Sequence, residues 1–324
     1  MSARPVVVVG DALLDVDVEG TVERMCPDAP APVLDVGDES ARPGGAGLAA
    51  ALVAGRGAPV RLVTALERDE PGRRLFDLLD GTLDVLAGPA MGGTVVKCRW
   101  RTGGRTLLRT DHGRGVPAPR FAARLGLGRV LAGAGAVLVS DYGRGVAADP
   151  QVRGALTRAV ARGVPVVWDP HPRGPEPVPG VTLATPNLAE ARRAVAGPDG
   201  TADRVGPELA GRLVELWDAR AVAVTLGSGG AVVRHRDGSG SETLAPAVDG
   251  GDPCGAGDHF AGGVAAALAA GADVDDAVAE AVREAAGFVE RGGGATVRRR
   301  GNRWLQAAEP DLVAGTPPSG HRVA

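Results

Sequence analysis

Short runs of consecutive apolar residues alternate with helix-like stretches along most of this chain. The run at 6–9 ends in Gly10-Asp11, which is typical of a strand buried on both faces of a parallel sheet. Strands that alternate with helices predict an α/β fold with a mainly parallel central sheet. Further strands are predicted at 60–63, 136–139, 164–167 and 221–225, and helices at 45–54, 70–79, 119–131, 150–162, 207–217 and 260–270.

Two segments, at about 13–36 and 94–111, interrupt this alternation with extended patterns that have no crossover helix between them. They predict a small separate sheet, either a lid over the strand ends or an edge hairpin. We expect one domain over residues 1–300 with these lid segments inserted in it. The stretch 301–324 is polar and includes Pro317-Pro318, so we expect a poorly ordered tail.

Composition narrows the class of protein. The 324 residues are 44% hydrophobic and 23% charged, which is typical of a globular domain. A net charge of −3 gives no electrostatic basis for nucleic-acid binding. Three cysteines without a close pair argue against a disulfide framework or a structural zinc site. The first strand starts too near Met1 for a signal peptide, and no apolar run approaches a membrane span, so we expect a cytoplasmic protein.

The most informative chemistry is Gly255-Ala256-Gly257-Asp258, which opens the apolar helix predicted at 260–270. Glycines at a helix start expose N–H groups to an anion, and the helix dipole adds partial positive charge. A carboxylate beside such a cradle suggests phosphoryl transfer, with Asp258 as the base for an attacking hydroxyl. The alternative is a glycine-rich helix start without a function.

Other polar residues are predicted to share one edge of the sheet with this motif. Asp11, Asp141, Asp169 and Asn187 each follow a strand-like run, and ligands of α/β sheets bind at the carboxyl ends of strands. Lys97 is the only lysine among 36 basic residues. It is either retained for its compact ammonium group or accidental.

Four motifs, in order and spacing, resemble those of the ribokinase-like (PfkB) carbohydrate kinases, and the resemblance runs from about Val6 to Val297. It implies a three-layer αβα fold with a small β lid, and ATP and Mg²⁺ as cofactors. The motifs are Gly10-Asp11-x-x-Leu14-Asp15, Pro43-Gly44-Gly45-Ala46, Thr185-Pro186-Asn187-x-x-Glu190 and Gly255-Ala256-Gly257-Asp258.

Further motifs resemble one branch of that family, the D-glycero-β-D-manno-heptose 7-phosphate kinases. No nucleotidyltransferase His-x-Gly-His motif is present, so we expect the kinase part of that branch alone. The motifs are Gly20-Thr21-x-x-x-Arg24, the stretch 27–33, Arg42-Pro43-Gly44-Gly45, Thr94-x-x-Lys97-x-Arg99, Arg109-x-Asp111, residues 138–142 and Asp169-Pro170.

The resemblance implies roles for individual residues. Asp258 is the expected base, and the amides of Gly255, Ala256 and Gly257 form the anion cradle. Glu190, with Asn187, is expected to position Mg²⁺ largely through water. The expected nucleotide contacts are Asn187, Thr225, Gly227, Ser228 and Gly230. The expected substrate contacts are Asp11, Asp15, Gly44, Gly45, Lys97, Arg99, Arg109 and Asp141.

Each of these roles has a simpler alternative. Asp11 and Asp15 could be a turn residue and a solvated lid carboxylate, and Gly44-Gly45 could form only a tight turn. The three lid cations could be a solvated strand face. Asn187 could cap a helix, and the glycines after Thr225 could form a hairpin turn.

The resemblance therefore predicts ATP-dependent phosphorylation of the anomeric hydroxyl of heptose 7-phosphate, giving the 1,7-bisphosphate. Departures from the family pattern at Leu48, His171, Cys254 and His259 favour a kinase of another sugar as the first alternative. A non-catalytic ligand-binding protein is a second. An NAD-dependent oxidoreductase is a third, but the Gly-x-Gly-x-x-Gly spacing is absent after the first strand. We expect no nucleic-acid or membrane partner and a homodimer through the lid.

Overall fold

The structure is a computed structural model that describes residues 4–196 and 206–306. Its central sheet has ten strands, mostly parallel, with antiparallel strands β13, β14 and β8 at the two edges. The strand order is β14 (Gly240–Thr243), β13 (Ala231–His235), β12 (Ala221–Thr225), β11 (Leu183–Ala184), β10 (Val166–Asp169), β9 (Ala136–Ser140), β1 (Val6–Gly10), β4 (Val60–Leu66), β5 (Asp84–Met91) and β8 (Val116–Pro117).

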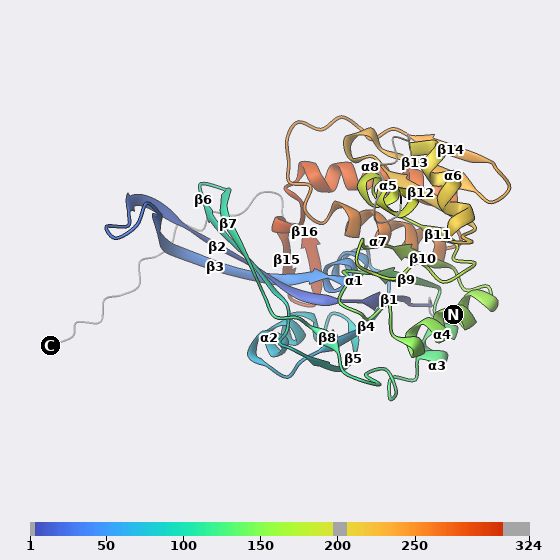
Figure 1. Ribbon diagram of the computed structural model, residues 1–324, viewed down its shortest axis with the longest axis horizontal. Coiled ribbons are helices and arrows are strands. Elements are labelled where there is room, and N and C mark those ends of the chain that lie inside the picture. Colours follow the sequence, from blue (N-terminus) through green and yellow to red (C-terminus); the bar gives the residue numbers. More distant parts are fainter. Residues whose placement is uncertain (1–3, 197–205, 307–324) are drawn as a thin grey trace.

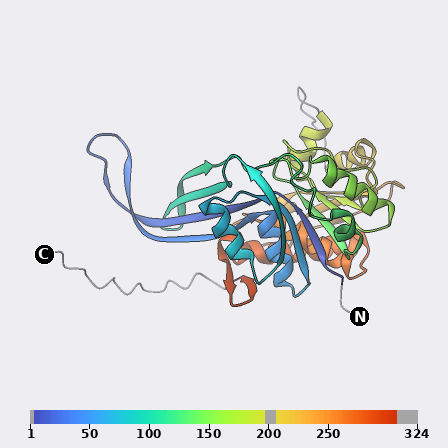
Figure 2. The same ribbon diagram turned by 90° about the horizontal axis from the view of Figure 1, so that it is seen from below.

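Helices cover both faces of this sheet, which makes three layers (Figures 1 and 2). Along β1, Val6 and Val8 pack into one core and Val7 and Val9 into the other, which explains the unbroken apolar run. One face carries α1 (Ala46–Gly55), α2 (Glu70–Leu79), α7 (Ala256–Ala269) and α8 (Val274–Glu290). The other carries α3 (Leu127–Ala132), α4 (Pro150–Ala161), α5 (Leu188–Ala196) and α6 (Gly206–Leu216).

The predicted α/β architecture with a mainly parallel sheet is confirmed, with one element corrected. The helix predicted at 119–131 is limited to α3, which begins at Leu127. Arg120 and Gly126 both adopt positive φ, at 61°, and this interrupts a continuous helix.

The interrupting segments form a separate four-stranded sheet, as the lid prediction required. Its order is β3-β2-β6-β7, and it projects from one side of the layered body (Figure 1). Met25, Val36 and Leu108 are more than half exposed on this lid. The homodimer through this sheet stays a prediction. The strands are β2 (Ala12–Met25), β3 (Pro32–Gly45), β6 (Val96–Thr102) and β7 (Arg105–His112).

The predicted tail boundary at residue 301 is wrong for its first residues, because β15 (Val297–Arg300) and β16 (Arg303–Gln306) form a hairpin after η2 (Gly293–Thr296). Trp304 is 2% exposed, packs with Leu48 and Phe288, and donates from Nε1 to Thr82 Oγ1 at 3.0 Å. The domain therefore includes this hairpin. The rest of the predicted tail, 307–324, lies outside the described residues. Among the described helices, none is both long and apolar enough to cross a membrane.

Replacing Trp304 with alanine should remove this buried contact and lower the free energy of unfolding by about 3–5 kcal/mol. Urea unfolding followed by circular dichroism measures the change. The matched control is Leu305→Ala, because Leu305 is 40% exposed on the same strand and should change stability by about 0.5 kcal/mol or less. Equal stability of the two variants would show that the hairpin is not part of the domain core.

Candidate active site

The first turn of α7 presents backbone to an open space. Gly255 precedes the helix at φ 82°, and a Cβ there would lie 3.0 Å from Leu48 Cδ2, so glycine is favoured. A Cβ on Gly257 would meet nothing within 4 Å. N–H groups in a first turn have no helical acceptor. The Ala256 N–H is already used, since it donates to Pro253 O at 3.0 Å, so Gly257 is the open part of the predicted cradle.

Asp258 lies in the same turn with its carboxylate buried, at 5% exposure. The Tyr142 hydroxyl donates to both of its oxygens, at 2.9 Å to Oδ1 and 2.8 Å to Oδ2. Burial raises the pKa of Asp258 to about 7, against the lowering effect of the Tyr142 hydrogen bond. Asp15 raises this pKa further and Lys97 lowers it. A carboxyl group that titrates near neutral pH suits a general base.

A cavity of about 200 Å³ lies beside Asp258, where the carboxyl ends of the strands meet the start of α7. The predicted residues Asp141, Asn187, Glu190, Thr225, Gly255, Gly257 and Asp258 line it together. A wider hollow of about 850 Å³ along α3 and α4 contains none of the predicted site residues. The residues predicted to meet at the carboxyl ends of the strands therefore line the smaller of these two cavities.

Asp11 accepts hydrogen bonds from the loop that follows β9. Its oxygens accept from the backbone N–H groups of Tyr142 at 3.1 Å, Arg144 at 2.9 Å and Val146 at 3.0 Å. Burial raises its pKa, and these three hydrogen bonds oppose the rise. The carboxylate is 4% exposed and both of its oxygens accept hydrogen bonds, so Asp11 holds the loop after β9, and its contact with a sugar stays a prediction.

Asp141, in that loop, has one free oxygen. Its Oδ1 accepts from the Gly143 N–H at 2.7 Å, whereas Oδ2 is buried without a hydrogen-bond partner. Burial raises its pKa to about 7. A Cβ on Gly174 would lie 1.7 Å from that oxygen, so only glycine fits at position 174. The unpartnered oxygen belongs to a residue that lines the cavity, as expected for a group that binds a ligand.

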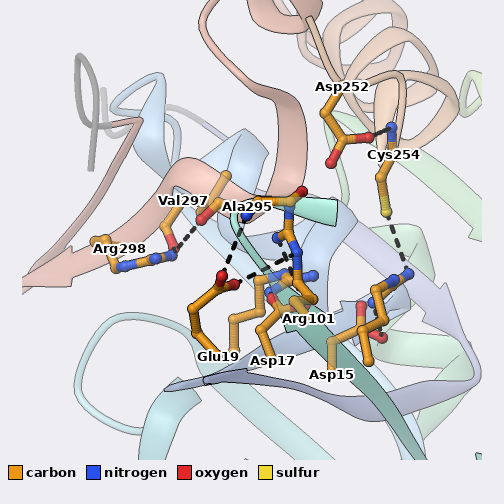
Figure 3. Close-up of polar contacts among 12 residues, drawn as sticks. Asp15, Asp17, Glu19, Arg101, Asp252, Cys254, Ala295, Val297 and Arg298 are labelled. Atoms are coloured by element: carbon orange, nitrogen blue, oxygen red, sulfur yellow. Dashed lines mark hydrogen bonds and ion pairs between the residues drawn. The ribbon is translucent and has the colours of Figure 1, made fainter. Parts of the chain in front are cut away.

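The lid presents acidic and basic residues in adjacent rows. Asp15, Asp17 and Glu19 alternate along β2 (Figure 3) and pair in register with Lys97, Arg99 and Arg101 of β6. Arg99 Nη1 donates to Asp15 Oδ1 at 3.3 Å, and its Nη2 contacts Cys254 Sγ at 3.4 Å. The lid is thus joined directly to the residue that precedes the anion cradle.

Gly44 and Gly45 make room for this arrangement. A Cβ on Gly44 would lie 2.6 Å from Asp15 Oδ2, and Gly45 has φ 59° with its Cβ position 2.4 Å from Asp11 O. Both glycines stand at the end of β3, and Gly45 precedes α1. The lack of side chains at these two glycines lets Asp15 and the backbone of Asp11 pack closely against them. The sequence had suggested only a tight turn as the simpler role.

Of the predicted lid cations, Lys97 is the most available. Burial lowers its pKa, its Nζ lies 5.0 Å from the centre of the Tyr142 ring, and it forms no ion pair with any residue that the structure describes. Arg109 faces Arg99 across β6 and β7, but it donates to both oxygens of Asp111 at 2.7 and 2.6 Å. Arg109 is therefore largely neutralised by its neighbour.

Asn187 and Glu190 form a reciprocal cap at the start of α5. Asn187 Oδ1 accepts from the Glu190 N–H at 3.0 Å, and Glu190 Oε2 accepts from the Asn187 N–H at 2.9 Å. The capping alternative is thus correct for these contacts. Burial raises the pKa of Glu190. Within 4–196 and 206–306, no three His, Cys, Asp or Glu side chains are grouped to hold a metal, and the binding of Mg²⁺ by Asn187 and Glu190 stays a prediction.

The predicted nucleotide loop is the hairpin between β12 and β13. Thr225 ends β12 and forms a bridge with Asn187, and η1 (Gly227–Gly229) makes the turn. The Leu226 N–H donates to Gly230 O at 2.8 Å. Thr225 lines the cavity, but Gly227, Ser228 and Gly230 lie beyond its lining. Their contact with a nucleotide stays a prediction.

The four departures from the family pattern divide into two groups. His171 lines the cavity and Cys254 contacts Arg99. Leu48 instead packs at 2% exposure in the cluster with Phe288, and His259 stacks on Phe288 at 4.6 Å between ring centres. Burial lowers the pKa of His259 to about 3. His171 thus borders the cavity and Cys254 contacts the lid, whereas Leu48 lies 3.0 Å from the position that a Cβ on Gly255 would take.

Three residues of the site were not among the predicted contacts. Tyr142 bonds to Asp258, and Asp169 lines the cavity with Thr185, whose Oγ1 donates to Asp169 Oδ1 at 3.0 Å. Burial raises the pKa of Asp169 well above its ordinary value, and the charge of Asp258 adds to this. Asp169 was predicted at the strand edge but was given no role. Tyr142 lies in the motif at 138–142 and is the only tyrosine in the chain, but it too was given no role.

Comparisons with known proteins agree with this geometry. The pfkB family carbohydrate kinase model matches residues 146–299. The Bifunctional protein HldE of Streptomyces coelicolor is 45% identical over 95% of this chain and 65% of its own length. The Bifunctional protein HldE of Azorhizobium caulinodans is 36% identical over 99% of this chain and 67% of its own length. The chain therefore spans about two thirds of the length of these relatives.

Solved structures share the fold. Arabidopsis thaliana ribokinase complexed with ribose and ATP superposes with a TM-score of 0.67 at 22% identity, covering 90% of this chain and 95% of that one. This likeness shows that the three layers and lid are ribokinase-like. With its motifs, its fold and its similarity to these relatives, the chain belongs to the pfkB family of carbohydrate kinases, phosphotransferases that act on a sugar hydroxyl.

Proposed function

We propose that this chain is an ATP-dependent kinase that phosphorylates the anomeric hydroxyl of D-glycero-D-manno-heptose 7-phosphate to give the 1,7-bisphosphate. The observation that carries the proposal is the buried Asp258 carboxylate in the first turn of α7, beside the cavity at the strand ends. A base next to an open helix start is the arrangement that phosphoryl transfer to a hydroxyl requires.

The chain's own residues account for the proton and the charge. Asp258 accepts the proton of the acceptor hydroxyl, and the Gly257 amide with the positive end of α7 stabilises the negative charge on the transferring group. ATP with Mg²⁺ supplies the phosphoryl group when bound. In this proposal Thr225 and the hairpin after it would hold the nucleotide, Asn187 and Glu190 would hold the hydrated ion, and the unpartnered Asp141 Oδ2 would accept from a substrate hydroxyl.

A phosphorylated substrate is supported by the lid. Lys97 is a partly buried ammonium without an ion pair among the described residues, and an anionic group on the substrate would supply the missing partner. Asp15, held against Gly44 and bonded to Arg99, can accept hydrogen bonds from sugar hydroxyls. Similarity to proteins named Bifunctional protein HldE points to the heptose branch.

A kinase of another sugar or sugar phosphate is the second candidate. His171 and Cys254 differ from the pattern of the heptose kinases, and His171 borders the cavity while Cys254 contacts the lid. The same base and cradle would serve either substrate. Only the acceptor differs between the two candidates.

A panel of acceptors separates them. The purified chain is incubated with ATP and Mg²⁺ and either heptose 7-phosphate or free sugars, and the product is identified by ³¹P and ¹H NMR. We expect turnover of the phosphorylated heptose with a new phosphate on C1. Turnover of free sugars without turnover of heptose 7-phosphate would contradict the first candidate and favour the second.

Asp258→Asn should lower kcat by about 10²–10⁴-fold and change KM by only a few-fold, because the base acts in the transition state. Steady-state kinetics at pH 8 measures both. The same variant should be at least as stable as the wild type at that pH, since asparagine has no charge to bury. Asp77→Asn, an exposed change on α2, is the matched control. A kcat near that of the wild type would refute the assignment of the base.

A further inference from the structure

Tyr142 is the only side chain that the structure shows hydrogen-bonded to the carboxylate of Asp258 within the described residues. Its hydroxyl lies 2.9 and 2.8 Å from the two oxygens and donates one hydrogen to the pair. A hydrogen bond to an ionised carboxylate is stronger than one between neutral groups. The hydroxyl therefore both orients the carboxylate and favours its ionised form.

The Tyr142 ring is held by groups from two other elements. Lys97 Nζ of the lid lies 5.0 Å from the ring centre, in the range of a cation–π contact. The His171 ring, after β10, stacks at 6.5 Å between centres with 22° between planes. The ring is thus placed between the lid and the strand edge, where a sugar phosphate would bind.

The backbone that carries Tyr142 is held as well. Its N–H donates to Asp11, which also accepts from Arg144 and Val146. Gly143 follows at φ 66°, where a Cβ would lie 2.6 Å from His171 Nδ1. These contacts hold the loop from within the fold, so the position of the hydroxyl is set by the protein itself.

We propose that Tyr142 is a positioning residue for the reaction, whose hydroxyl aims the Asp258 carboxylate at the acceptor hydroxyl and keeps it ionised until that hydroxyl arrives. The proposal rests on the proposed function, because it presumes that Asp258 acts as a base. The proposal also links the lid to Asp258, because Lys97 of the lid contacts the ring of the same tyrosine.

The charges around Asp258 set the expected direction of change. Asp15 of β2 and Asp169 of β10 repel its ionised form, and Lys97 of β6 attracts it. Burial is the largest effect and raises the pKa, whereas the Tyr142 hydrogen bond is the largest effect that lowers it. Removing the hydroxyl therefore raises the pKa, and the base is protonated over a wider pH range.

The first test compares Tyr142→Phe with the wild type in kcat/KM from pH 5.5 to 9. We expect the acid limb of the phenylalanine variant to move up by about one pH unit, with a loss of about tenfold at pH 6.5 that largely recovers at pH 8.5. Tyr142→Leu also removes the ring and should raise KM for the sugar phosphate in addition. An unchanged pH profile for the phenylalanine variant would overturn the proposal in favour of a packing role.

The second test does not depend on activity. Because the chain has one tyrosine, ¹³Cζ-tyrosine labelling gives one NMR signal. In the wild type this signal should shift as Asp258 titrates near pH 7, and the shift should be absent in Asp258→Asn. A pH-independent signal in an active kinase would overturn the role of Tyr142 and leave the proposed function intact. A titrating signal in a chain inactive on every sugar would contradict the proposed function while supporting the contact.

Discussion

Burial of the Asp258 carboxylate is the constraint around which the rest of the site is arranged. The difference between its pKa of about 7 and the ordinary value of 3.8 corresponds to about 4 kcal/mol. Because the folded pKa lies above the unfolded one, the protonated form contributes its full stability at low pH. That contribution is lost as the pH rises from about 4 to 7. Three features stabilise the ionised form of Asp258 at neutral pH. They are the start of the alanine- and glycine-rich helix α7, the Tyr142 hydroxyl and the charge of Lys97.

Several charged side chains of the lid are also buried or partly buried, and they are stabilised by opposite charges nearby. Arg42 is 3% exposed and paired with Asp17, while Arg101 lies 3.9 Å from both Asp17 and Glu19. Rows of opposite charge on adjacent strands compensate one another, while Leu14, Val16 and Val18, which alternate with the acidic residues of β2, pack into the core. This arrangement leaves Lys97 as the cation with the least local compensation. An anionic group on the proposed substrate would supply the partner that Lys97 lacks, close to Asp258.

Much of this could be predicted from the sequence. Apolar runs such as Val6–Val9 identified the parallel strands, because a strand that is buried on both faces of the sheet needs an apolar residue at every position. Residues after those strands had to meet at one edge, which brought Asp141, Asn187 and Thr225 together. Asp258 followed from its place after two glycines at a helix start. These features depend on local order along the chain.

What the sequence did not reveal depends on three-dimensional pairing. The spacing of Asp11 suits a sugar contact, but its oxygens bind amides more than 130 residues away. Leu48 and His259 sit beside motif residues in sequence, yet both pack against Phe288, with Leu48 also next to Gly255. Tyr142 reaches Asp258 across 116 residues, and no periodicity marks such a contact. Trp304 belongs to the core although it falls in the stretch 301–324 that the sequence analysis assigned to a polar tail.

The central claim is that Asp258 is a buried base poised near neutral pH, and its own titration tests this most directly. Aspartate labelled with ¹³C at Cγ, with the Asp258 signal assigned by its loss in Asp258→Asn, reports the carboxyl group itself between pH 4 and 9. The account predicts a midpoint of about 7 for that signal. A midpoint near 4 would show a solvated carboxylate and would contradict it.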